Sequence, residues 1–190
     1  MSNVTDFIKQ LQEWGRRETG EERTTMAELR RGLQEFPHLA PYMHRYLARF
    51  TTDARGWDKQ TYYLVAALFA RYHSGSKAPI YSDKAYDNMG AYFAAVAREE
   101  PDGSESIERR FNALLTAHPD DLHYHLRQAI AFLHGKDIAI PINWEGLFWN
   151  IRDWDSDDRR PRVQEAWAVG FWRHKARTTD ESNPQTEPTN

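Results

Sequence analysis

The stretch that decides the fold is WDKQTYYLVAALFARYH, residues 57–73. Apolar and aromatic side chains recur along it at helical spacing and cover more than half of the helix circumference: Tyr63, Leu64, Val65, Leu68, Phe69 and Tyr72. A helix of this kind must be covered by other elements on most of its sides, because its apolar surface cannot face water. We therefore predict a central, buried helix around which the rest of the chain is arranged.

Helical spacing continues on both sides of this segment, and no alternating pattern of useful length appears outside a short stretch at 139–142. Thr24 or Thr25 is placed to cap a short helix, and Glu28 follows Thr25 at the spacing of a capping box. Gly135 is placed to end a later helix. The sequence thus predicts an all-α fold, a helical bundle of about nine helices.

The best internal boundary is EEPDGSES, residues 99–106, where Pro, Gly, Ser and acidic residues cluster. We expect an N-terminal helical subdomain at 1–100 and a C-terminal helical subdomain at 101–177. The last stretch, TTDESNPQTEPTN, contains Pro and acidic residues and has no Lys or Arg. Residues 178–190 are therefore expected to form a disordered acidic tail.

The composition describes a folded chain with little net charge. Apolar residues make up 40% of its 190 residues and include seven Trp, which require a substantial core. The formal charge is −3, and without the acidic tail the basic and acidic side chains balance. A neutral body argues against strong nucleic-acid binding by a single copy, although one face can still be basic if the acids lie elsewhere.

Several observations indicate a soluble, cytoplasmic protein without membrane contact. The longest apolar run, at 64–70, is far shorter than the roughly 20 residues that a membrane span needs. The N-terminus has no apolar run of the signal-peptide type. The absence of Cys removes disulfides, thiol nucleophiles and thiolate metal sites, and it fits a reducing compartment.

No catalytic or cofactor-binding motif emerges. The phosphate-binding, dinucleotide-binding and nucleophile-elbow patterns are absent from the sequence. Asp153, Asp155 and Asp157 have the spacing of a calcium loop, but Asp158 and Gln164 stand where Gly and Glu are required. We expect no metal, no cofactor and no enzymatic activity, with an unrecognised His and Asp site as the remaining catalytic alternative.

The basic side chains are more informative, because four adjacent pairs occur: Arg16–Arg17, Arg30–Arg31, Arg109–Arg110 and Arg159–Arg160. In the helix expected at 107–115, Arg109 points away from the apolar stripe and Arg110 lies on its flank. Arg at such positions can hold phosphates through bidentate hydrogen bonds. The alternative is that each pair is ordinary solvated surface with local salt bridges.

Aromatic rings offer a second way to bind nucleic acid, by stacking on single-stranded bases. The rings that lie furthest from the apolar stripes of their helices are Trp57, Tyr62, Trp149 and Trp172. Most of the Trp residues are nevertheless expected in the core or at interfaces.

Six segments follow one another in a characteristic order: AELRRGL (27–33), LVAALFARYH (64–73), NMGAYF (88–93), SIERRFNALL (106–115), DLHYHLRQAI (121–130) and INWEGLFWNIRDW (142–154). This ordered set resembles the CasB family, the small subunit of the type I-E Cascade, a CRISPR surveillance complex. The resemblance covers roughly residues 7–175. Its specificity lies in the order of the segments, since no single segment is a strict motif.

The resemblance implies a helical protein with two small subdomains and no catalytic activity. It also implies two copies side by side, along the crRNA-bound backbone subunits and touching the large subunit. The family is thought to stabilise the R-loop by binding nucleic acid, including the displaced non-target DNA strand. Its motifs carry this role onto Arg30, Arg31, Arg109, Arg110 and Arg127.

Five further arginines match no motif and are weaker candidates by charge alone: Arg16, Arg17, Arg23, Arg159 and Arg160. A second reading stays open beside nucleic-acid binding. In that reading the protein is purely architectural, and its arginines bind carboxylates of partner subunits.

Overall fold

The computed structural model describes residues 3–36, 39–75, 78–80, 88–136 and 138–181, and of residues 174–181 it describes the backbone alone. Its regular elements are all helical in these ranges, which confirms the all-α prediction. The α-helices are α1 (Asn3–Arg16), α2 (Gly20–Arg31), α3 (His44–Leu47), α4 (Gly56–Tyr72), α5 (Met89–Glu99), α6 (Ser104–Leu115), α7 (Leu122–His134), α8 (Trp144–Trp154) and α9 (Arg160–Glu181).

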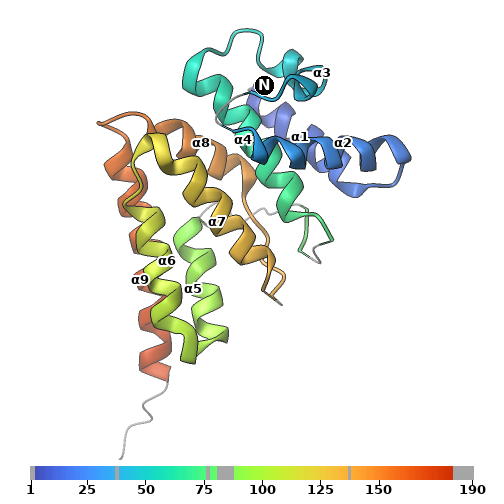
Figure 1. Ribbon diagram of the computed structural model, residues 1–190. Helices are drawn as coiled ribbons and strands as arrows, with labels where there is room; N and C mark the ends of the chain where they lie inside the picture. The colour runs from blue at the N-terminus through green and yellow to red at the C-terminus, as the bar shows by residue number, and fades with distance from the viewer. Residues whose placement is uncertain (1–2, 37–38, 76–77, 81–87, 137, 182–190) are drawn as a thin grey trace, which may run out of the picture.

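Helix α4 is the centre of the fold, as its sequence predicts. Every residue from Thr61 to Ala70 is buried, so this part of the helix has no solvent-facing side. Helices α1, α2, α7 and α8 pack around it and supply the cover that its apolar surface requires. Figure 1 shows α4 running between the α1–α2 pair and the α7–α8 pair.

A second group consists of α5, α6 and α9, which run side by side (Figure 1). Helices α5 and α9 approach closely because each presents a glycine. A Cβ atom at Gly90 would overlap the carbonyl oxygen of Trp167, and a Cβ atom at Gly170 would lie 2.5 Å from Oδ1 of Asn88. The rings of Phe111 and Phe171 stack with centroids 4.5 Å apart and tie α6 to α9.

The indole N–H groups connect helices that are distant in the sequence. Four of them donate across the fold: Trp57 to the carbonyl of Ile151 at 2.8 Å, Trp144 to Nε2 of His73 at 3.1 Å, Trp154 to the carbonyl of Ala117 at 3.1 Å, and Trp167 to Oδ1 of Asn150 at 2.7 Å. Large rings are thereby buried without leaving their donors unsatisfied.

One expectation about local structure was wrong. The cap of α2 is Thr19, which forms a capping box with Glu22, so Thr24 and Thr25 lie inside the helix. Thr19 with Glu22 and Thr25 with Glu28 both have the spacing of a capping box, and the helix begins after the earlier one, Thr19. The segment from Pro41 to Phe50 consists of two 3-10 turns on either side of the short α3.

The proposed division at 99–106 contains a 3-10 turn, Pro101–Gly103, between α5 and α6. Helix α5 precedes this turn, yet it packs against α6 and α9, which follow it. The subdomains at 1–100 and 101–177 stay a prediction. Helix α9 continues to Glu181, so residues 178–181 of the expected tail are helical, and 182–190 lie outside the described residues.

The described helices include none with both the length and the apolar character needed to cross a membrane.

The burial of His73 predicts acid sensitivity. Its side chain is 6% exposed and accepts the Trp144 N–H, which requires a neutral ring. Burial, helped by the charge of Arg17, lowers the pKa of His73 from 6.5 to about 4. Between pH 6.5 and pH 4, His73 is therefore protonated in the unfolded chain and neutral in the folded chain. From pH 7 to pH 5 this residue should cost roughly 2 kcal/mol of unfolding free energy.

This loss is measured by urea unfolding at both pH values. His73→Gln keeps an acceptor for Trp144 and should abolish about that much of the pH dependence. Equal pH dependence in the wild type and His73→Gln would contradict the assignment.

The contact between α5 and α9 predicts an unusual effect of alanine. Gly90→Ala should lower the unfolding free energy by about 1–3 kcal/mol or more, because the new methyl group meets rigid backbone. The matched control is Gly20→Ala, whose Cβ has only a flexible Arg23 nitrogen 3.9 Å away. That variant should be as stable as the wild type or slightly more stable, since alanine favours helix. Thermal unfolding of the two variants decides the point.

Candidate nucleic-acid interface

The motif arginines lie on the surface of three helices. Arg30 and Arg31 occupy the last turn of α2, Arg109 and Arg110 lie on α6, and Arg127 lies on α7. All five are exposed. In α6 the buried side is formed by other residues of the same helix, Ile107, Phe111 and Leu114, so the predicted orientation of its arginine pair is confirmed.

Helix α7 connects these arginines in space. Arg127 reaches the 3-10 turn Gly32–Gln34, which directly follows α2, and its Nη1 donates to the carbonyl of Leu33 at 3.3 Å. On the other side of α7, the guanidinium carbon of Arg110 lies 5.5 Å from the ring centroid of Phe132. The structure thus brings Arg127 beside the 3-10 turn that follows α2, and Arg110 beside α7. For Arg109, no polar partner is found in the described part of the chain.

The end of α2 forms a further concentration of positive charge. Arg30 hydrogen-bonds Ser74 just after α4, and Arg31 lies over the ring of Tyr42 at 5.2 Å. Arg17 follows α1 with a φ of 56°, and its Nε is buried without a partner. Burial and the nearby charge of Arg30 both lower the pKa of Arg17. Two guanidinium groups are therefore held close together here.

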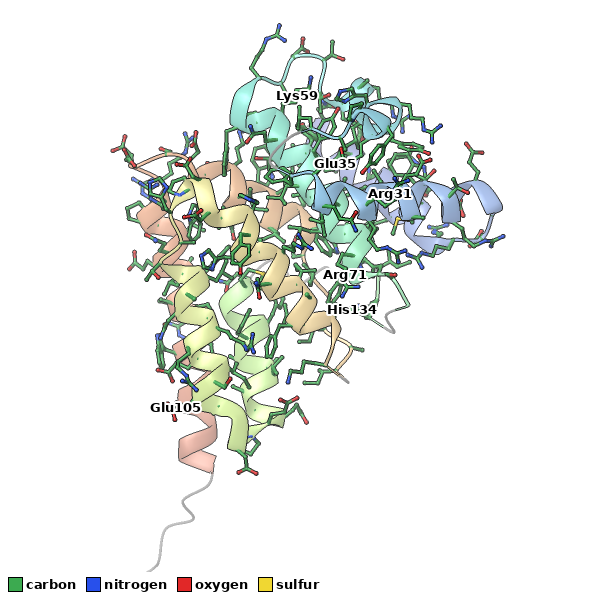
Figure 2. The ribbon with its side chains drawn as sticks, viewed as in Figure 1. Arg31, Glu35, Lys59, Arg71, Glu105 and His134 are labelled. Carbon is green, nitrogen blue, oxygen red and sulfur yellow. The ribbon has the colours of Figure 1, made fainter. Side chains whose placement is uncertain are left out.

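Figure 2 shows side chains that end in nitrogen atoms and side chains that end in oxygen atoms on both groups of helices. It labels Arg31 on α2, and Arg71 and His134 on the last turns of α4 and α7. His134 Nδ1 lies 2.9 Å from the carbonyl of Tyr72, so the ends of α4 and α7 are in contact.

The remaining candidate arginines have different surroundings. Arg159 is ion-paired with Asp153 at 2.9 Å, and Arg160 is ion-paired with Asp157. These two acids belong to the calcium-like spacing of the sequence, so their charge is already matched by arginine. Arg160 also donates to the carbonyl of Trp154, the last residue of α8.

At the turn between α1 and α2, Arg16 lies 3.9 Å from Glu13, and Arg23 donates to the carbonyls of Arg17 and Glu18. These contacts are local. The five motif arginines differ from Arg159 and Arg160 in one respect that matters for binding: in the described ranges none of the five forms an ion pair with a carboxylate.

The aromatic candidates are only partly accessible. Tyr62 is buried against Phe7 and Phe148, so its selection was wrong. Trp57 and Trp149 are half-buried, and Trp172 is 42% exposed. Among the described residues the most exposed large ring is Tyr124, at 54%, which helical spacing did not single out.

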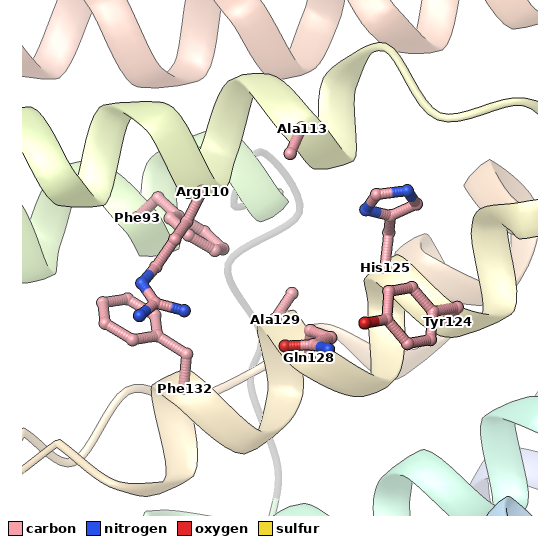
Figure 3. A pocket seen from close by; sticks show the side chains of 8 residues that line it. All are labelled: Phe93, Arg110, Ala113, Tyr124, His125, Gln128, Ala129 and Phe132. Atoms are coloured by element: carbon pink, nitrogen blue, oxygen red, sulfur yellow. The ribbon is translucent and has the colours of Figure 1, made fainter.

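Tyr124 belongs to a groove between α6 and α7 of about 230 Å³, lined by Phe93, Arg110, Ala113, Tyr124, His125, Gln128, Ala129 and Phe132 (Figure 3). Sequence reasoning missed this groove, because its two walls come from different helices. The signal that could have found it is the run of exposed positions on α7, at which Tyr124 and Gln128 are one turn apart.

In the ranges that the structure describes, no three His, Asp or Glu side chains are grouped to hold a metal ion. The motif arginines offer positive charge and hydrogen-bond donors, and Tyr124 offers an accessible ring. These are the means by which proteins hold a nucleic-acid backbone.

Comparison with known proteins identifies relatives of this chain. Residues 25–172 match the family model of CRISPR-associated protein Cse2. A Cse2 protein from Thermus thermophilus is 32% identical over 166 residues, which cover 84% of this chain and 86% of that protein. The crystal structure of CasB from M. ruber matches with a TM-score of 0.76 and 31% identity, covering 96% of this chain and 99% of that one.

A chain of a CRISPR RNA-guided surveillance complex has the same fold, with a TM-score of 0.72, 21% identity, and coverage of 95% of this chain and 98% of that chain. The family model and the Thermus thermophilus relative each span most of the chain, which confirms the resemblance carried by its ordered segments. The chain belongs to the CRISPR-associated Cse2 (CasB) family.

Proposed function

We propose that this protein is a non-catalytic small subunit of a CRISPR Cascade surveillance complex, and that it acts in the cytoplasm. In this role it binds nucleic-acid backbone without reading sequence and stabilises the R-loop by holding the displaced non-target DNA strand. Its partners are the crRNA-containing backbone subunits, the large subunit and a second copy of itself. Family membership and the fold shared with a surveillance-complex chain support the proposal.

The observation that carries the nucleic-acid role is the state of the arginines. Arg30, Arg31, Arg109, Arg110 and Arg127 are exposed, and in the described ranges none of them forms an ion pair with a carboxylate. An arginine that already has a carboxylate partner must break that ion pair before it can bind phosphate. The unpaired arginines avoid this cost, and their planar guanidinium groups suit phosphate oxygens.

The physics of R-loop formation fits such a subunit. The RNA–DNA heteroduplex is about as stable as the duplex that it replaces, so modest backbone contacts can decide the balance. The body of the protein is nearly neutral, which limits the affinity of one copy. Alignment of several copies and subunits along one strand raises the effective concentration of each contact and compensates for this weakness.

The alternative function is purely architectural, with the arginines bound to carboxylates of partner subunits. The internal contact of Arg127 with Leu33 weakens the case for a nucleic-acid role of this one arginine, because its side chain already serves the fold. The exposed Trp172 and Val169 on α9 also offer an apolar surface of the kind that protein partners cover.

The decisive experiment compares two double variants in a complex reconstituted with this chain. Arg109→Ala with Arg110→Ala should shorten the R-loop lifetime roughly tenfold or more, because two charge-assisted contacts are lost. The affinity of this variant should also fall less steeply with salt concentration. The slope of log affinity against log salt concentration should become shallower by the equivalent of about one to two phosphate contacts. The matched control, Arg159→Ala with Arg160→Ala, removes the same charge from ion-paired positions and should have a small effect.

Both variants must assemble normally for this comparison, which gel filtration of the complex checks. An R-loop lifetime that is unchanged in the Arg109 and Arg110 variant would contradict the nucleic-acid role. Loss of assembly in that variant, with normal thermal unfolding of the free chain, would support the architectural function.

A further inference from the structure

The groove between α6 and α7 has two chemically different ends (Figure 3). At one end the Arg110 guanidinium lies over the Phe132 ring, and Phe132 in turn stacks on Phe93 with centroids 5.3 Å apart. At the other end the exposed Tyr124 ring stands edge-on to His125, with centroids 5.6 Å apart. Aromatic surface and a positive charge therefore face the same space.

The middle of the groove is open because its residues there are small. Ala113 on α6 and Ala129 on α7 line it, and Gln128 places an amide beside them (Figure 3). Its volume of about 230 Å³ is below the roughly 300–1,000 Å³ that is usual for sites holding whole small molecules. The space suits one planar ring system.

The charge of the groove narrows the choice of ligand. No carboxylate lines it, and Arg110 belongs to the pair that has no ion-paired carboxylate among the described residues. A lysine or arginine side chain of a partner would be repelled by Arg110. A nucleotide offers what the groove requires, a flat ring joined to an adjacent anion.

We propose that this groove receives one unstacked nucleobase of single-stranded nucleic acid, while Arg110 at its rim and the adjacent Arg109 on α6 hold the neighbouring phosphates. This inference rests on the proposed function and assigns it a stacking site. A base adds affinity through its aromatic face, without adding charge to the protein. The groove therefore gives a nearly neutral subunit a means of holding a strand that charge alone does not provide.

The site should tolerate every base. Tyr124 offers exposed ring surface, which all four bases can use. The amide of Gln128 both donates and accepts, so it does not select one pattern of base-edge groups.

The test fills the groove without changing its charge. Ala113 is exposed on α6, so Ala113→Leu projects a larger side chain into the groove and buries nothing in the core. The control is Ala166→Leu, the same change at an exposed alanine of α9 that does not line the groove. Thermal unfolding of the free chains verifies that both variants fold.

The probe is a target duplex with a pre-opened bubble, bound by a complex reconstituted with this chain. The non-target strand within the bubble is either oligo-dT or a chain of abasic units with the same length and charge. The wild type and Ala166→Leu should release the dT probe roughly tenfold more slowly than the abasic probe. Ala113→Leu should release both probes at the rate of the abasic one.

The outcomes separate the two proposals. Equal release of both probes by the wild type, at a rate that Arg109→Ala with Arg110→Ala increases, would overturn the base site and leave the backbone role intact. Release that depends neither on those arginines nor on the presence of the displaced strand would overturn both. A slower release of dT that survives in Ala113→Leu would also overturn the groove as the site.

Discussion

The structure depends on the complete burial of one helix. From Thr61 to Ala70, α4 has no side that faces water, so every direction around it must be occupied by another element. Helices α1, α2, α7 and α8 fulfil this requirement, and their own polar faces then become the surface of the protein. The placement of α7 between α4 and α6 follows from the same constraint, and α7 carries the contacts that join the candidate binding residues.

Which arginines are available to bind an anion depends on which of them have carboxylate partners, and not on the net charge of the chain. Opposite charges nearly balance over the chain, yet the acids at the turn between α8 and α9 are matched to Arg159 and Arg160. Arg159 and Arg160 are thus ion-paired locally, whereas the arginines of α2, α6 and α7 that resemble the family motifs have no ion-paired carboxylates among the described residues. A protein of almost no net charge can in this way present phosphate-binding side chains. Charge counts over a whole chain are a poor guide to such a surface.

Much of the fold could be predicted because helical spacing is a local property. The buried central helix, the capping of α7 by Gly135, and the outward direction of Arg109 and Arg110 all follow from residues within a few turns. The start of α2 could not be predicted with the same success, since Thr19 and Thr25 both satisfy the capping pattern. The helix begins at the earlier of the two, and Thr25 is then buried in its interior.

The sequence by itself determined the helical class, the central helix, the family and the arginines worth testing, because each depends on spacing or order along the chain. Only the tertiary structure decided which arginines have carboxylate partners and which side chains share a groove. Arg159 and Asp153 meet across a turn, and Arg110 meets Phe132 across two helices. Such contacts depend on how helices pack, and packing is fixed by the joint burial of all their apolar faces rather than by any one segment.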